Sequence, residues 1–262
     1  MARKWTKNEE IEKRRELTQL YVRENKSIGD IAKALGLSES TVYDRLVRLR
    51  IPVSRSRKLY YNNKRNDIVL PRQHSKDLAE FVGILLGDGH ISPTQVMVTL
   101  GKKDEYAEYV AEVMEKLFRV RPKILVLRTG DKVVYIGSTT LVRWFLAMGL
   151  TANKVAAQVD VPNWIFADKE YVKRVVRGLF DTDGSVYKLK FGIQISFSNR
   201  SQPLLCSFRK MLVLLDYQPS RISGPRVYLT RIPDIKRFFE EIKPKNTKHI
   251  KRFKNFMHAP VG

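Results

Sequence analysis

The chain has 262 residues, and 49 Lys and Arg against 27 Asp and Glu leave it a formal net charge of +22. Hydrophobic residues make up 43%, which is enough for a packed core and excludes a wholly disordered chain. The only cysteine, Cys206, excludes an intramolecular disulfide framework and a cysteine-based zinc finger. Such a charge opposes compact folding through self-repulsion, so we expect a polyanionic partner, nucleic acid first, with a generally basic surface as the alternative.

No apolar run approaches the roughly 20 residues needed to cross a bilayer. The first residues, Met1-Ala-Arg-Lys-Trp, lack the apolar core of a secretory signal. We therefore expect a soluble intracellular protein without a membrane partner.

Residues 1–50 are predicted to form three helices. Ser27 and Ser38 can each cap a helix start, and Gly36 sits where the intervening turn needs a positive φ. This pattern resembles the helix-turn-helix family, in which the second of the paired helices enters the major groove of DNA. The resemblance implies DNA contacts from Ser38, Ser40, Thr41, Asp44, Arg45 and Arg48. A small helical bundle that binds protein is the alternative.

Residues 51–74 are basic and polar and show no periodicity, which predicts an extended linker. Such a linker could follow the DNA backbone or serve only as a solvated tether.

From Ser75 onward the chain contains an internal repeat. Residues 77–89 read DLAEFVGILLGDG and residues 170–184 read EYVKRVVRGLFDTDG. Asp88 precedes Lys154 by 66 residues, and Asp183 precedes Lys248 by 65. Each copy reads as helix, two strands, helix, two strands, helix. The sequence therefore predicts an α+β fold with two pseudo-symmetric αββαββα halves, residues 75–165 and 166–262, after the small all-α domain.

The first helix of each copy carries small residues four positions apart. These are Gly83 and Gly87 in the first copy, and Gly178 and Thr182 in the second. Such a stripe lets two helix backbones approach closely. Two helices packed in this way would bring their C-terminal ends side by side.

Asp88 and Asp183 follow these helices and would then lie close together. Two carboxylates at helix C-termini repel each other unless cations bridge them. Oxygen ligands without histidine or thiolate indicate Mg²⁺. The alternative is that both aspartates only cap helix ends, but the same pattern twice in so basic a chain favours the metal site.

Residues 81–89 (FVGILLGDG) and 176–184 (VRGLFDTDG) resemble the two motifs of the single-chain LAGLIDADG homing endonuclease family. The resemblance extends from about Ser75 to the C-terminus. It implies that Asp88 and Asp183 are metal-binding catalytic acids, and that Gly87 and Thr182 offer backbone carbonyls to Mg²⁺. It also implies that Mn²⁺ substitutes and that Ca²⁺ binds without supporting cleavage.

The same resemblance implies saddle-shaped antiparallel sheets that lie along the DNA major groove, and cleavage of both strands by a monomer. The first copy departs from the motif at Leu86, where an earlier Asp is often found. The second copy retains it as Asp181, which we expect to be structural.

Three further residues match the family's active-site groups. Lys154 and Lys248 resemble the basic residue that polarises the phosphate or a water, with an ordinary solvated lysine as the alternative. Asn199 matches the amide that orients water, and the first copy has no clear equivalent. We therefore expect two active sites of unequal quality.

Alternation along the predicted strands gives a set of polar residues on one face, where Arg, Lys and Gln can read bases or hold phosphates. The predicted DNA-facing set is Gln95, Met97, Thr99, Lys102, Lys103, Arg128, Lys132, Tyr135, Lys188, Lys190, Gln194, Ser196, Ser198, Arg200, Arg221, Arg226 and Tyr228.

The prediction is a Mg²⁺-dependent, site-specific endonuclease for double-stranded DNA. A non-catalytic helix-turn-helix DNA-binding regulator and an RNA maturase that assists intron splicing remain as alternatives.

Overall fold

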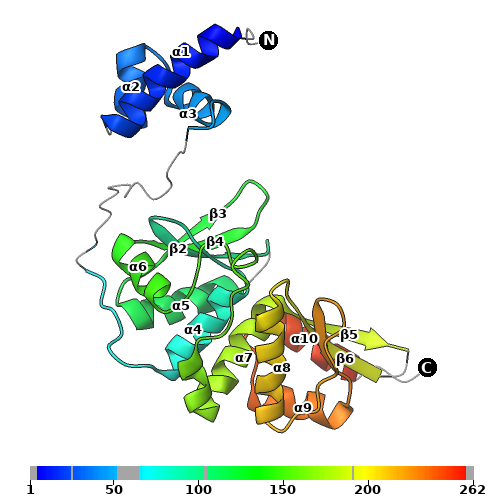
Figure 1. Ribbon diagram of the computed structural model, residues 1–262. Helices are drawn as coiled ribbons and strands as arrows, with labels where there is room; N and C mark the ends of the chain where they lie inside the picture. The colour runs from blue at the N-terminus through cyan, green and yellow to red at the C-terminus, as the bar shows by residue number, and fades with distance from the viewer. Residues whose placement is uncertain are drawn as a thin grey trace. The chain divides into compact units, whose positions relative to one another are not determined.

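The computed structural model describes residues 5–24, 26–51, 65, 67–102, 105–190 and 192–257. The chain divides into two compact units, Met1–Tyr60 and Tyr61–Gly262 (Figure 1). Most of the predicted linker, and Lys103, lie outside the described residues. Within the described part of the chain, no helix combines the length and the apolar character that a membrane crossing requires.

The first unit is helical, as predicted. It contains α1 (Lys7–Thr18), which continues as a π-helical turn (Gln19–Arg23), followed by α2 (Ile28–Leu35) and α3 (Glu39–Arg48). The hydroxyl of Ser27 accepts from Asp30 N at 3.0 Å and that of Ser38 from Thr41 N at 3.2 Å, so both predicted caps are present. Gly36 ends α2 with a φ of +62°. The unit has its own core around Leu17, Tyr21, Ile31, Val42 and Leu46.

The first half of the second unit has the predicted αββαββα order. Its elements are α4 (Lys76–Leu86), β1 (Gly89–Ile91), β2 (Gln95–Leu100), α5 (Tyr106–Phe118), β3 (Lys123–Val126), β4 (Lys132–Gly137) and α6 (Thr139–Ala147). The strands form an antiparallel sheet in the order β1-β2-β4-β3. A 3₁₀ turn (Asn163–Ala167) leads into the second half.

The second half departs from that order in one strand. Its elements are α7 (Lys169–Asp183), β5 (Gly184–Leu189), β6 (Gly192–Ser198), α8 (Gln202–Leu214), β7 (Arg226–Leu229), α9 (Ile232–Glu241) and α10 (Thr247–Met257). Among the described residues the sheet has three strands, β5-β6-β7. The expected strand around Arg221 is replaced by an irregular segment, of which only Ser223 bridges to Arg226.

Helices α4 and α7 pack at backbone distance, as the small-residue stripe predicts (Figure 1). A Cβ on Gly83 would lie 2.5 Å from Val175 O, and one on Gly178 would lie 2.4 Å from Glu80 O. Only glycine permits this approach, because each contact is with backbone that cannot rotate away. The two halves consequently share a single apolar core.

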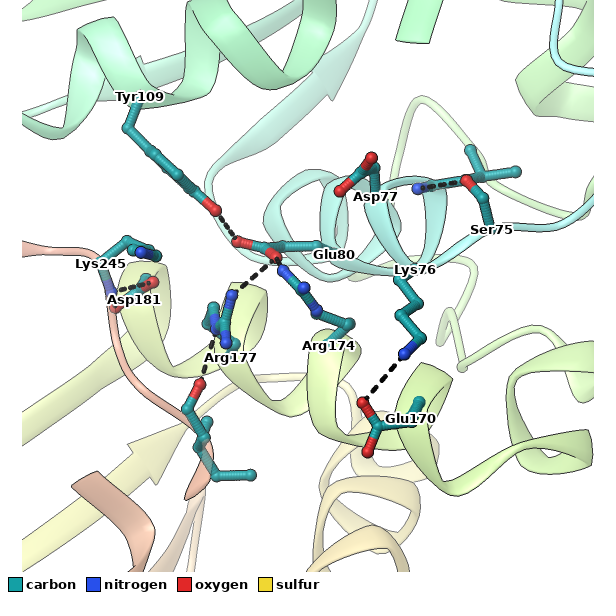
Figure 2. A network of polar contacts seen from close by, with 12 residues as sticks. Ser75, Lys76, Asp77, Glu80, Tyr109, Glu170, Arg174, Arg177, Asp181 and Lys245 are labelled. Carbon is teal, nitrogen blue, oxygen red and sulfur yellow. Dashed lines mark hydrogen bonds and ion pairs between the residues drawn. The ribbon is translucent and has the colours of Figure 1, made fainter. Parts of the chain in front are cut away.

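A buried polar network joins the halves along this helix pair (Figure 2). Glu80 of α4 is 1% exposed and accepts from Arg174 Nη1 at 2.7 Å and Arg177 Nη1 at 3.1 Å, both on α7. Tyr109 of α5 also donates to Glu80, and Arg177 Nε donates to Ile242 O at 2.6 Å. One carboxylate therefore links α4, α5 and α7, and through Arg177 the end of α9. No local sequence pattern indicated this network.

Candidate active site

The C-terminal ends of α4 and α7 meet at Gly87 and Thr182. A Cβ on Gly87 would lie 1.9 Å from Thr182 Oγ1, so no larger residue fits there without a shift of the helix ends. The single O–H of Thr182 is directed back along α7, between Gly178 O at 2.9 Å and Leu179 O at 3.1 Å. Asp88 follows Gly87 and Asp183 follows Thr182, so both aspartates leave the same junction.

The carboxyl of Asp183 is half-buried and lies within the influence of the negative charge of Asp88. Burial first, and then the charge of Asp88, raises the pKa of Asp183 to about 7. Two interactions act in the opposite direction and lower the pKa of Asp183. They are a 2.8 Å hydrogen bond from Asn199 Nδ2 and the positive charge of Lys154. Asn199 is itself fixed, because its Oδ1 accepts from Ser201 N at 2.8 Å. The structure thus brings together Asp88, Asp183, Asn199 and Lys154.

Lys154 lies against the end of α4. Its Nζ donates to Leu85 O at 3.3 Å, to Leu86 O at 3.1 Å and to Gly87 O. Burial lowers the pKa of Lys154, whereas the charges of Asp183 and Asp88 act to raise it. This lysine is therefore part of the site and not a solvated side chain.

The donor set at this junction fits a hard divalent cation. It consists of two carboxylates and helix-end carbonyls, and such oxygens suit Mg²⁺. The three carbonyls at the end of α4 already hold one cation, the ammonium of Lys154. Across the part of the chain that the structure describes, no group of three or more His, Cys, Asp or Glu side chains is placed to hold a metal. The aspartate pair is thus the candidate centre.

Lys248 does not match Lys154 in position. It is exposed at the start of α10, where its backbone N–H donates to Asn246 Oδ1 at 3.1 Å. Among the described residues, the groups that shift the pKa of Asp183 include Lys154 and not Lys248. The two lysines follow the aspartates at nearly equal distances in the sequence, but they do not occupy equivalent positions in the fold. The reason is that α10, which carries Lys248, has no counterpart among the described elements of the first half.

Asp181 holds the loop before α10 and does not face the junction. Its buried carboxylate accepts from Lys245 N at 2.9 Å and Asn246 N at 3.1 Å, and its carbonyl accepts from Asn246 Nδ2 at 2.9 Å. Burial raises the pKa of Asp181 to about 7, against these backbone bonds. This geometry is structural, as the sequence suggested.

The outward face of the first sheet contains Gln95, Met97 and Thr99, which alternate with buried Val96, Val98 and Leu100. Across the strands, Met97 pairs with His90 on one side and with Tyr135 on the other, and Tyr135 pairs with Lys123. His90 and Lys123 were not predicted for this row. Lys132 was placed on the wrong face, because its partner is the core residue Leu100. Arg128 is exposed in the β3–β4 turn, and Lys102 is exposed after β2.

The second sheet corrects the predicted face of β5. Gln194 pairs with Tyr187 and Ser196 with Ser185, whereas Lys188 pairs with the buried Ile193. Tyr187 and Ser185 therefore share the face of Gln194, and Lys188 does not.

The other predicted positions around this sheet vary in exposure. Ser198 pairs with Arg226 and Ser196 with Tyr228, so these four residues share one face of the sheet, as predicted. Ser196 is nevertheless buried. Lys190, Arg200 and Arg221 are exposed in connecting segments.

The predicted DNA-facing residues of α3 are only partly free to make contacts. Ser38 and Thr41 are occupied in the helix cap. Arg48 pairs with Glu10 at 2.9 Å and lies 4.4 Å from the ring centre of Trp5, and Arg45 lies 5.4 Å from that ring centre. The exposed positions of α3 include Ser40, Tyr43, Asp44 and Val47, which follow helical spacing. Tyr43 and Val47 were missed because their apolar character resembles that of core positions.

Two family models match segments of the chain. The model of the LAGLIDADG-like domain matches residues 170–243, and that of the WhiA LAGLIDADG-like domain matches residues 1–47 and 79–159. The chain therefore contains LAGLIDADG-like domains in both halves, where the two motifs lie.

The curated relatives are far longer than the regions matched, so the chain spans only a small part of each. The chain is 31% identical to replication factor C small subunit of Methanocaldococcus jannaschii over 119 residues, 44% of this chain and 6% of that protein. It is 29% identical to an A-type ATP synthase protein of Pyrococcus abyssi over 165 residues, 62% of this chain and 16% of that protein.

Similar solved structures include the N-terminal LAGLIDADG domain of DUF199/WhiA and I-DmoI in complex with DNA and Mn. The first has 16% identity and a TM-score of 0.47, with 68% of this chain and 88% of that chain covered. The second has 16% identity and a TM-score of 0.48, with 64% of this chain and 96% of that chain covered.

Proposed function

We propose that the chain is a site-specific endonuclease that hydrolyses both strands of a DNA duplex with Mg²⁺ and acts as a monomer. The observation that carries the proposal is the junction of α4 and α7. There the packing of Gly87 on Thr182 brings Asp88 and Asp183 close enough for the charge of one to raise the pKa of the other. A net charge of +22 supports a phosphate-rich substrate.

The residues of the site have distinct roles under this proposal. Asp88 and Asp183 would hold the ion, together with the carbonyls of Gly87 and Thr182. When bound, the ion would lower the pKa of a bound water and polarise the phosphate. Asn199 orients the Asp183 carboxylate through its 2.8 Å hydrogen bond. Because Lys154, and not Lys248, is among the groups that shift the pKa of Asp183, the two strands would be cut with unequal efficiency.

The substrate would lie along the outward faces of the two sheets. The row of His90, Met97, Tyr135 and Lys123 on the first sheet offers donors, an apolar surface and positive charge to the groove. In the first unit, α3 would enter a second groove segment through Ser40, Tyr43, Asp44 and Val47. The unit would lengthen the recognised site without taking part in the chemistry.

A non-catalytic DNA-binding regulator is the second candidate function. The WhiA-type match favours it, since this model covers the N-terminal segment as well as the first half. The absence of Lys248 from the groups that act on Asp183, among the described residues, also weakens catalysis in the second half.

Selection followed by cleavage separates the two candidates. The protein would first select duplexes from a randomised library in Ca²⁺, and the selected duplex would then be placed in a supercoiled plasmid and incubated with Mg²⁺. We expect linear product from the wild type and none from Asp88→Asn or Asp183→Asn, both of which should still bind the duplex.

Asp216→Asn is the matched control, because it makes the same change at a side chain that is 83% exposed. Tight, selective binding by the wild type without any cutting would refute the endonuclease and support the regulator.

A further inference from the structure

The ammonium of Lys154 is saturated by the end of α4. An ammonium has three N–H donors and no acceptor. All three donors have partners here, namely the carbonyls of Leu85, Leu86 and Gly87. These carbonyls lack partners within the helix and form the negative end of its dipole. In this arrangement Lys154 has no donor left for a phosphate or a water.

The same lysine bonds one of the oxygens that would hold the metal. Gly87 O accepts from Lys154 Nζ and is also the carbonyl assigned to the ion, and Asp88 is the next residue. Lys154 interacts electrostatically with both Asp88 and Asp183. A divalent ion at this oxygen cluster would repel the ammonium strongly, because two cations only a few ångströms apart interact across a half-buried site.

The second half has no equivalent arrangement among the described residues. At the end of α7 the matching carbonyls have other partners: Phe180 O accepts from Gly184 N, and Asp181 O accepts from Asn246 Nδ2 at 2.9 Å. Lys248 is exposed on α10. Any competition between lysine and metal is therefore confined to the α4 side.

We propose that Lys154 is a displaceable cation: it neutralises the aspartate pair and the α4 carbonyls while no metal is bound, and a divalent ion displaces it from Gly87 O. Displacement frees its three donors for the scissile phosphate, so metal arrival and phosphate binding are coupled through one side chain. This inference rests on the metal site of the proposed function.

Amine labelling of the intact wild-type protein tests the displacement directly. The rate of acetylation at each lysine would be followed by mass spectrometry with and without Ca²⁺. We expect Lys154 to be protected without the ion and to react on the order of tenfold faster with it, which corresponds to loss of one charge-assisted hydrogen bond. Lys248 is the internal control and should react at one rate throughout. An unchanged rate at Lys154 overturns the proposal.

Calorimetric titration with Ca²⁺ tests the competition. Lys154→Met keeps the apolar stem and removes the charge, so Ca²⁺ should bind this variant about tenfold more tightly than the wild type. Lys248→Met should bind as the wild type does. Equal or weaker binding by Lys154→Met overturns the proposal, and the labelling result on the wild type decides the matter if this variant does not fold.

The two experiments separate this inference from the proposed function. A protein that cuts DNA with Mg²⁺ but shows no Ca²⁺-dependent change at Lys154 keeps the endonuclease and loses the inference. A protein whose Lys154 is displaced but that cuts no DNA keeps the inference and loses the endonuclease. Absence of Ca²⁺ binding to both the wild type and Lys154→Met overturns the inference.

Discussion

Substitution of Gly178 by alanine tests whether the approach of α4 and α7 holds the two halves together. The new Cβ would lie 2.4 Å from Glu80 O, 2.7 Å from Ile84 N and 3.0 Å from Gly83 C. All three atoms are backbone, so the helices must separate. Overpacking of this kind costs about 3 kcal/mol, and the higher helix propensity of alanine returns about 1 kcal/mol. The net loss of about 2 kcal/mol corresponds to a melting temperature lower by roughly 4–8 °C.

The measurement is thermal unfolding followed by circular dichroism, with urea unfolding to obtain the free energy. Gly101→Ala is the matched control, because no atom beyond its two chain neighbours lies within 4 Å of its new Cβ. Its melting temperature should stay at that of the wild type. If Gly178→Ala melts with the wild type and the control, the backbone contact does not determine how the halves associate, and the explanation for the paired aspartates fails with it.

Three further outcomes are expected. Glu80→Ala should lower the free energy of unfolding by about 3–5 kcal/mol, because Arg177 is left buried without its counter-charge. The control is Glu115→Ala at an exposed ion pair, which should cost about 1 kcal/mol or less. A loss for Glu80→Ala no larger than that of the control would contradict the role of the network. In metal-free buffer the free energy of unfolding should fall as pH rises from about 4 to about 7. The folded-state pKa of Asp183, about 7, lies above its unfolded value, so the native state binds an extra proton in that window and loses this advantage as the proton leaves. Urea unfolding over that range should give a shallower fall for Asp183→Asn, and an equally steep fall in the variant would show that Asp183 is not the source. A chain of residues 61–262 should keep the unfolding transition of the larger unit, since the two units have separate cores, and it should lose DNA affinity. Failure of this chain to fold would contradict the independence of the units.

Helix faces were predictable from the sequence because they follow from local spacing. Residues four apart lie on one side of a helix whatever surrounds it, so the stripes that begin at Gly83 and at Gly178 predict the close packing from the sequence alone. The caps at Ser27 and Ser38 are equally local, since each hydroxyl reaches an N–H three residues on. Repetition of the motif then indicated two halves with an aspartate at each helix end.

Strand faces across a hairpin were not predictable in the same way. Alternation holds within β6, but the side on which β5 presents Lys188 depends on the register of the hairpin. Leu189 pairs with Gly192, so odd-numbered residues of β5 share a face with even-numbered residues of β6. The same reasoning moved Lys132 to the core side of β4.

The sequence by itself determined the local features: the helix starts, the small-residue stripes, the duplicated aspartates and the positive net charge, which favours a polyanionic partner. Tertiary structure alone decided which distant groups meet. It placed Lys154 on the carbonyls of α4 and left Lys248 exposed, although their offsets from the aspartates differ by one residue. It also buried Glu80 between two arginines of the other half. The physical reason is that contacts between distant segments depend on how whole elements pack, and an added helix such as α10 changes that packing without disturbing the spacing of the motifs.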